Sequence, residues 1–354
     1  MADQSWRQKP GLMSPQVVNA LATRIQEHVA THQPAKIDIV FHGGEPLLGG
    51  VSYLVDIKKA IEEVLPAGVA SFGMQTNGLL LSTSVLDTLV TEKIGFGISL
   101  DGPRQVNDLH RVYRGGRRGS YDRVIGALAN IAKHPAKELF SGYLAVIQVD
   151  YPPEALIEYF VSIGTERLDL LLPHGDWDVL PPGMAYPEEG RYGRWLIEAF
   201  DCWFDRFPNI RLRFFSDLLK LFFSGQNVVE SLGLGAKSIV VVETDGAIEG
   251  LDTLRAVKEG ATNIGLNVLA NSFDEALSHP AVLSRYLGED ALAPLCRQCQ
   301  YMNVCGGGYL PHRYSRSLGY LNASVYCKDL FDLCRHVANR IGKEIGHGAP
   351  ILSN

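Results

Sequence analysis

Short apolar segments alternate with amphipathic helical segments through the first half of the chain. The apolar segments predict strands at 37–41, 70–75, 95–100, 142–149 and 168–172. Helices are predicted between and after them at 52–64, 84–92, 120–133 and 153–163. A further helix, with Ser14 as its N-cap and Pro15 as its first residue, precedes the first strand. Because a helix between two strands returns the chain to the same end of a sheet, the pattern predicts βα units and a parallel sheet.

Polar or glycine-rich residues stand at most of the predicted strand ends. In a parallel sheet, ligands sit beyond the carboxyl ends of the strands. Glycines allow a ligand to approach the main chain, a carboxylate can hold an ammonium group, and an arginine can pair a carboxylate. Each residue alone is equally typical of an ordinary turn, but their recurrence predicts a site made of Gly43, Gly44, Glu45, Gln75, Asn77, Ser99, Asp101 and Arg111.

Four cysteines near the C-terminus have the spacing of metal or cluster ligands: Cys296, Cys299, Cys305 and Cys327. We call this set the cysteine ladder. Three glycines follow its third member and would let the main chain lie close to a bulky ligand. Six cysteines in 354 residues are few for a disulfide scaffold, and no secretory signal is recognised, so a reducing, cytoplasmic location is expected. Zinc and an iron–sulfur cluster both remain open. Cys202 and Cys334 are predicted to be packing residues, with Cys334 a reserve ligand.

Composition excludes two classes of partner. A net charge of -6 argues against a nucleic-acid-binding surface, which is normally basic. No apolar run approaches the length of a membrane-spanning helix, so no membrane partner is expected.

The strand-end motifs and the cysteine ladder together resemble the radical S-adenosylmethionine enzymes that carry a C-terminal SPASM or twitch domain. The motifs are Gly43-Gly44-Glu45-Pro46, Gln75-Thr76-Asn77-Gly78 and Ser99-Leu100-Asp101-Gly102. Segments 2–6, 42–46, 172–174 and 305–308 look more closely like the FxsB-type peptide-modifying members. The resemblance spans nearly the whole chain. It implies a partial (β/α)6 TIM-like barrel, lacking its first strand, at 1–180, a linker with helices at 181–235, and a small SPASM/twitch-like cluster domain at 236–354.

The resemblance also assigns roles to residues that match the family's motifs. Gly44 and Glu45 would hold the amino end of S-adenosylmethionine, and Ser99 and Arg111 its ribose and carboxylate region. The other strand-end residues named above complete the expected cofactor site. The cysteine ladder would bind one auxiliary 4Fe–4S cluster, since the ligands of a second auxiliary cluster are not matched. No catalytic residue is assigned.

One motif of the family is missing from these 354 residues. The C-x3-C-x2-C that binds the catalytic cluster follows the family's first strand, whereas the first cysteine here is Cys202. A start set at an internal methionine or a truncation is favoured over a degenerate copy. In the family, this cluster passes an electron to S-adenosylmethionine, and the resulting radical removes a hydrogen atom from the substrate. The chain as printed is therefore expected to bind S-adenosylmethionine poorly and to be inactive.

The resemblance implies radical modification of a ribosomally made precursor peptide, by cross-linking of side chains. The expected electron donor is a flavodoxin or a ferredoxin. Two alternatives remain open. One is a non-catalytic peptide-binding scaffold of the same fold, and the other is a structural zinc protein that uses the cysteine ladder.

Overall fold

A parallel sheet of six strands forms the larger part of the protein. In the computed structural model, which describes residues 2–116, 118–225, 230–235, 239–283 and 287–344, the strands lie side by side in chain order. Every neighbouring pair is parallel. The strands are β1 (Ile37–Phe41), β2 (Ala70–Thr76), β3 (Ile94–Ser99), β4 (Phe140–Val146), β5 (Arg167–Leu171) and β6 (Arg211–Leu212). The predicted α/β class and parallel sheet are confirmed.

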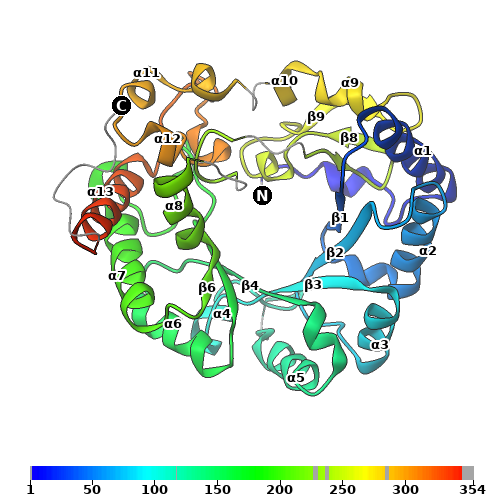
Figure 1. Ribbon diagram of the computed structural model, residues 1–354, viewed down its shortest axis with the longest axis horizontal. Coiled ribbons are helices and arrows are strands. Elements are labelled where there is room, and N and C mark those ends of the chain that lie inside the picture. The colour runs from blue at the N-terminus through cyan, green and yellow to red at the C-terminus, as the bar shows by residue number, and fades with distance from the viewer. Residues whose placement is uncertain (1, 117, 226–229, 236–238, 284–286, 345–354) are drawn as a thin grey trace.

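Helices cover the outer face of this sheet, which curves into an arc (Figure 1). Ser14 caps the first helix, because its hydroxyl accepts a hydrogen bond from the main-chain N–H of Val17 at 3.3 Å. The apolar faces of the helices and strands form a common buried core. The helices are α1 (Pro15–His32), α2 (Val51–Glu62), α3 (Thr83–Glu92), α4 (Arg104–Asn107), α5 (Tyr121–Ile131), α6 (Pro153–Ser162), α7 (Arg191–Arg206) and α8 (Arg213–Ser224).

The sixth strand corrects the expectation of five. Strand β6 lies within 181–235, where a linker and helices were expected, and it pairs Arg211 with Arg167 and Leu212 with Leu168. Two residues are too few to show the alternating pattern on which strand prediction depends. Strands β1 and β6 are the two edges of the sheet.

The C-terminal region lies across the open side of the arc, between those two edges (Figure 1). It contains a small antiparallel sheet of β7 (Val241–Val242), β8 (Ala247–Glu249) and β9 (Asn263–Asn267). An Asp-Gly pair in the sequence is typical of a hairpin turn, and Asp245 and Gly246 join β7 to β8, with Gly246 at a φ of 82°. The sequence of residues 238–243 also favours a strand, of which residue 238 lies outside the described residues. The helices that follow are α9 (Phe273–Leu277), α10 (Pro280–Leu283), α11 (Pro294–Arg297), α12 (Met302–Cys305) and α13 (Cys327–Glu344).

Polar contacts fasten the C-terminal region at both ends of the arc. On the β1 side, Lys9 Nζ lies 2.5 Å from Glu249 Oε1, and Arg24 Nε donates to the Val268 carbonyl at 2.9 Å. On the β6 side, α13 packs against α7, where the Gly193 N–H donates to Asp329 Oδ1 at 2.6 Å. The C-terminal region therefore bridges two edges that do not pair with each other.

Two glycine-to-alanine substitutions test the strand packing. Gly142 in β4 has a φ of 106°, and a Cβ there would lie 2.3 Å from the Arg167 carbonyl oxygen of β5. We expect Gly142→Ala to lower the free energy of unfolding by at least about 2 kcal/mol. The control, Gly126→Ala in α5, has open space around its Cβ. It should raise that free energy by about 0.5–1 kcal/mol, because alanine is the better helix former. Urea unfolding measures both, and equal effects would contradict the described strand geometry.

Candidate functional site

Glu45 connects the loop after β1 to the end of β2. Its Oε1 accepts hydrogen bonds from the Thr76 hydroxyl at 2.7 Å and the Leu47 N–H at 3.2 Å, and its Oε2 accepts one from the Asn77 N–H at 2.8 Å. A carboxylate offers about four acceptor positions, so one remains for a ligand's ammonium group. Thr76 is buried and was missed as a site residue, although a hydroxyl at the end of a buried strand is a signal for such a contact.

The two glycines before Glu45 leave open space beside the main chain. Gly43 and Gly44 are exposed, and a Cβ on either would meet no atom within 4 Å. Gly43 has a φ of 125°, which favours glycine. This loop can therefore accept a ligand directly against its backbone.

Gln75 and Ser99 join the ends of β2 and β3. The Gln75 side-chain amide donates to the Ser99 hydroxyl at 3.0 Å. Gly97 makes room for Gln75, because a Cβ at this position would lie 2.4 Å from Gln75 Oε1. The side chain of Asn77 supports its own turn instead, since Asn77 Oδ1 accepts from the Leu79 N–H at 2.9 Å. Two predicted residues are thus in contact, and the third shapes the loop.

Asp101 and Arg111 form an ion pair beyond the end of β3. Arg111 Nε lies 2.7 Å from Asp101 Oδ2, and Arg111 Nη2 lies 2.9 Å from Asp101 Oδ1. The Asp101 side chain is only 4% exposed and also accepts from the Val146 N–H of β4 at 2.9 Å. Asp101 therefore occupies the forked face of Arg111 that we expected to pair with a ligand carboxylate. The N–H groups of Nη1 are left to contact a ligand.

The cysteine ladder gathers at the starts and ends of short helices. Cys296 lies in α11, Cys305 ends α12 and Cys327 begins α13, with Cys299 just after α11. Burial, together with neighbouring ladder thiols, raises the pKa of Cys305 to about 12 and that of Cys327 to about 11. Thiols this close resist ionisation unless a cation offsets the charge of the thiolates. The donor set therefore suits a metal centre.

The ladder is too wide for a single zinc ion as it stands. Among the described residues, only His28, His32 and Asp274 bring three ligand atoms within 4.8 Å of one another, so no three ladder sulfurs do. A tetrahedral zinc bound at about 2.3 Å would hold its sulfurs about 3.8 Å apart. A four-iron cluster is larger than one ion, and its ligands stand farther apart.

The three glycines after Cys305 fold the chain tightly at the ladder. Gly306, Gly307 and Gly308 have φ values of 61°, 75° and 71°, and a Cβ on Gly306 would lie 1.8 Å from the Gly233 carbonyl oxygen. Larger residues would not fit this path. The glycine run is therefore required by backbone geometry as well as by space for a ligand.

A buried arginine stands beside the ladder and was missed by the sequence analysis. The Arg313 guanidinium donates to the carbonyl oxygens of Gly306 at 2.5 Å and Gly308 at 2.6 Å. No carboxylate lies within 4.0 Å of it in the described part of the chain. Burial lowers the pKa of Arg313, whereas the thiols of Cys305 and Cys296 act to raise it. An uncompensated buried cation is costly, so an anionic thiolate centre would balance it.

Aromatic residues next to the ladder pack on the end of β5. The Tyr326 hydroxyl donates to the Pro173 carbonyl at 2.8 Å, and the rings of His174 and His312 lie 6.3 Å apart. Burial lowers the pKa of His174 and lowers that of His312 to about 3, so the His312 ring is neutral near pH 7. Because the strands are parallel, their carboxyl ends lie on one side of the sheet. These contacts therefore place the ladder on the same side as Glu45 and Arg111.

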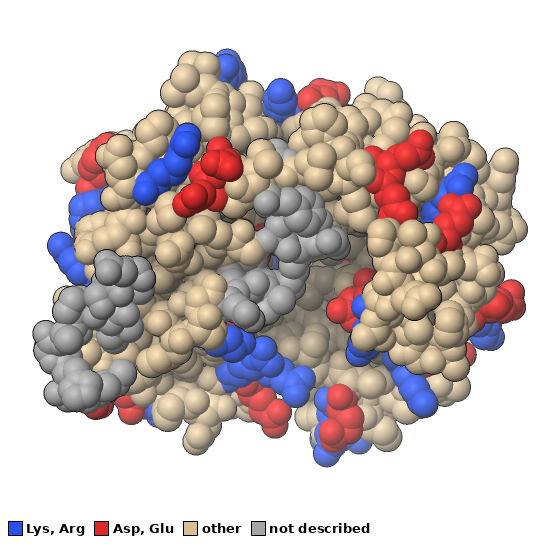
Figure 2. All heavy atoms as spheres, turned by 45° about the horizontal axis from the view of Figure 1, so that its top comes forward, with Lys and Arg blue, Asp and Glu red and all other residues tan. Residues whose placement is uncertain are grey.

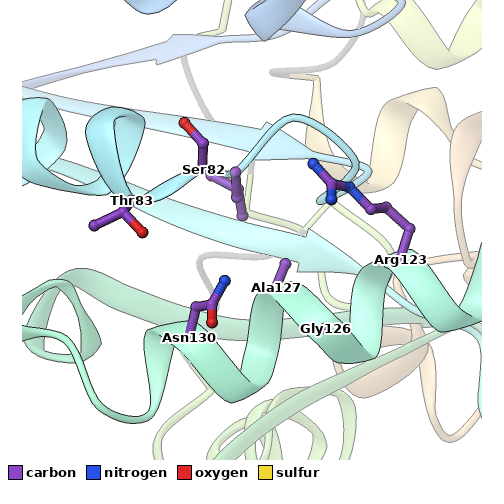
Figure 3. A pocket seen from close by; sticks show the side chains of 7 residues that line it. Ser82, Thr83, Arg123, Gly126, Ala127 and Asn130 are labelled. Carbon is purple, nitrogen blue, oxygen red and sulfur yellow. The ribbon is translucent and has the colours of Figure 1, made fainter.

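A surface pocket lies away from the predicted site residues. A pocket of about 290 Å³ opens between α3 and α5, as Figure 3 shows. Its lining consists of Leu81, Ser82, Thr83, Arg123, Gly126, Ala127 and Asn130. None of the predicted site residues lines it, so this pocket gives no support for a function.

Positive and negative side chains are mixed on the face of the molecule seen in Figure 2. Lysine and arginine side chains are interspersed with acidic ones over the face in Figure 2, which is hollowed near its middle. None of the helices in the described ranges combines the length and apolar composition that crossing a bilayer requires.

Comparison with curated proteins finds distant relatives along most of the chain. A cysteine-type anaerobic sulfatase-maturating enzyme of Clostridium perfringens is 22% identical over 353 residues, covering 94% of this chain and 88% of the relative. A serine-type anaerobic sulfatase-maturating enzyme of Bacteroides thetaiotaomicron is 21% identical, and the alignment covers 89% of this chain and 79% of the relative. No protein-family model matches the chain.

Comparison with solved structures agrees on the fold. Native anSMEcpe with bound AdoMet and a Kp18Cys peptide superposes with a TM-score of 0.79 and 20% identity, covering 94% of this chain and 91% of that one. SuiB of Streptococcus suis gives a TM-score of 0.55 at 16% identity, covering 86% and 70% of the two chains. The resemblance to radical S-adenosylmethionine enzymes is confirmed, with sulfatase-maturating enzymes as the homologues. The narrower FxsB-type resemblance stays a prediction.

The ion pair between Asp101 and Arg111 should contribute strongly to stability. We expect Asp101→Ala to lower the free energy of unfolding by about 3 kcal/mol, because it leaves a partly buried guanidinium unpaired and removes the acceptor of the Val146 N–H. The control is Asp122→Ala, which breaks the exposed pair with Arg104 and should have a much smaller effect. Urea unfolding of both variants measures the difference. Similar losses would show that Asp101 does not organise the ends of β3 and β4.

Proposed function

We propose that this protein is a radical S-adenosylmethionine enzyme that modifies a side chain of a peptide substrate. The observation that carries the proposal is that the strand-end residues and the contacts of Tyr326 and His312, next to the ladder, lie at the same carboxyl end of the sheet. The homologues support it, since they are enzymes named for maturing sulfatases, and one solved neighbour carries AdoMet and a peptide. The two reactions to distinguish are modification of a single cysteine or serine, as the relatives' names suggest, and side-chain cross-linking of a ribosomally made precursor.

The strand-end residues would bind S-adenosylmethionine. Gly43 and Gly44 give its amino-acid part access to the main chain, and Glu45 has one acceptor position left for its ammonium group. The Nη1 group of Arg111 would contact its carboxylate, held in direction by Asp101. The hydroxyl of Ser99, oriented by Gln75, would contact its ribose.

The cysteine ladder would hold one auxiliary 4Fe–4S cluster. Its four thiols supply the donors and Arg313 supplies a buried positive charge next to them. When bound, a catalytic 4Fe–4S cluster and S-adenosylmethionine supply a radical that can remove a hydrogen atom from a substrate. A flavodoxin or a ferredoxin would provide the electron. The contacts of Tyr326 and His312 with the end of β5 would keep the ladder at the carboxyl end of the sheet, where the peptide substrate would lie.

Removing one ladder thiol should remove the auxiliary cluster. We expect anaerobically reconstituted Cys305→Ser to lose most of the iron, acid-labile sulfide and brown colour of the parent, because a serine hydroxyl is a poor ligand for iron. Cys202→Ser serves as the control, since Cys202 lies in α7, outside the ladder, and its iron content should match the parent. One zinc per chain with no iron in the parent protein would support the structural zinc alternative instead.

The 354 residues by themselves should not cleave S-adenosylmethionine. Their first cysteine is Cys202, so they contain no C-x3-C-x2-C to hold a catalytic cluster. We would compare this chain with one extended by the coding sequence upstream, using dithionite, S-adenosylmethionine and peptides encoded by neighbouring genes. Release of 5′-deoxyadenosine only by an extended chain that carries the motif is the expected result.

The peptide products of that assay identify the reaction. Tandem mass spectrometry of the peptides separates a mass change confined to one cysteine or serine from a cross-link between two residues. Cleavage of S-adenosylmethionine by the 354 residues alone would contradict the role given to the missing motif. No cleavage by an extended chain that carries all three cysteines would favour the peptide-binding scaffold.

A further inference from the structure

We propose that His28, His32 and Asp274 form a binding site for a divalent transition-metal ion, separate from the cysteine ladder. His28 Nδ1 lies 2.7 Å from Asp274 Oδ1, and His32 Nε2 lies 2.9 Å from the same oxygen. Within the described ranges, this is the one group of histidine, cysteine and acidic side chains whose three ligand atoms all lie within 4.8 Å of one another.

The secondary structure presents these three side chains to one point. His28 and His32 are one turn apart on α1, so they share a face of the helix, and their ring centroids lie 4.5 Å apart. Asp274 lies in the first turn of α9, which a capping box holds in place: the Ser272 hydroxyl accepts from the Glu275 N–H, and the Glu275 carboxylate accepts from the Ser272 N–H. The two helices therefore fix the ligands before any ion binds.

The ligand types select borderline metals such as Zn²⁺, Co²⁺ and Ni²⁺. Two imidazole nitrogens and one carboxylate oxygen suit these ions and do not suit Mg²⁺ or Ca²⁺, which prefer oxygen ligands. Metal–ligand distances of about 2.0–2.2 Å in a tetrahedral site place the donor atoms about 3.3–3.5 Å apart. The present nitrogen–oxygen distances are those of hydrogen bonds, so an ion needs the side chains to separate by about 0.5 Å. Small side-chain rotations supply this, because all three side chains are partly exposed.

The position of the site suggests what a bound ion does. Helix α1 lies in the arc beside β1, whereas α9 belongs to the C-terminal region that crosses the open side (Figure 1). Nearby, Arg24 of α1 donates to the Val268 carbonyl at 2.9 Å, so the same two parts already meet there. A partly exposed imidazole–carboxylate contact is weak, and an ion shared by both helices would replace it with coordinate bonds. The ion would clamp the C-terminal region to the β1 edge of the sheet.

Binding of Co²⁺ to the anaerobically purified 354-residue chain tests the proposal without S-adenosylmethionine, substrate or activity. Equilibrium dialysis with metal analysis gives stoichiometry and affinity, and visible spectra separate nitrogen and oxygen ligation from thiolate ligation. We expect one Co²⁺ per chain that shows no thiolate-to-cobalt charge-transfer band. His28→Ala, His32→Ala and Asp274→Asn should each weaken this binding at least about tenfold. Removing a metal ligand should lower the affinity at least as much as removing a residue that only orients a ligand, which costs about tenfold or more.

His134→Ala is the matched control. His134 Nε2 lies 3.1 Å from Asp87 Oδ1, so this residue also pairs with a carboxylate but has no second histidine in the group. Its loss should leave Co²⁺ binding unchanged. Circular dichroism and thermal unfolding without metal show that each variant folds, and added Co²⁺ should raise the melting temperature of the parent more than that of His28→Ala. The proposal is overturned if His28→Ala and His32→Ala bind Co²⁺ as the parent does, or if all bound Co²⁺ shows thiolate ligation.

Discussion

The edges of the parallel sheet do not pair with each other, and the rest of the structure depends on how they are covered. Parallel strands with connecting helices curve into an arc whose ends are β1 and β6. The C-terminal region crosses between those ends, held by Lys9 and Arg24 on one side and by the packing of α13 on α7 at Gly193 on the other. Because the same region carries the cysteine ladder, the segment that covers the open side also places the four thiols at the carboxyl end of the sheet.

Hydrogen bonds between neighbouring strand ends organise the residues that we propose to bind S-adenosylmethionine. Glu45 bonds to the end of β2, Gln75 bonds to Ser99 at the end of β3, and Asp101 reaches β4 while it holds Arg111. Each polar side chain therefore has its direction fixed before a ligand arrives, which lowers the entropy that binding must overcome. The same contacts leave one acceptor position on the Glu45 carboxylate and the terminal nitrogen Nη1 of Arg111 available to a ligand.

Local signals in the sequence predicted the elements well and the long-range partners poorly. The N-cap at Ser14, the strands β1–β5 and the turn at Gly246 follow from residue type and spacing, because a few neighbouring residues decide them. Strand β6 was missed because two residues in a helix-rich segment show no period, and its pairing partner lies 44 residues away. The partner of Arg111 was predicted to be a ligand, whereas the chain itself supplies Asp101. Arg313 gave no signal, since one arginine in a loop does not reveal that its guanidinium is buried.

The sequence by itself determined the class of fold and the chemistry available to the site. Alternating strand and helix patterns admit only a parallel α/β arrangement, and spaced cysteines with strand-end motifs name the kinds of ligand. Only the tertiary structure decided which groups meet. It brings His28 and Asp274 together from helices about 250 residues apart and places Arg313 beside the thiols. It also pairs the guanidinium of Arg111 with Asp101 of the same chain. The physical reason is that periodicity and spacing are properties of neighbours along the chain, whereas burial, ion pairing and convergence of ligands depend on how distant segments pack.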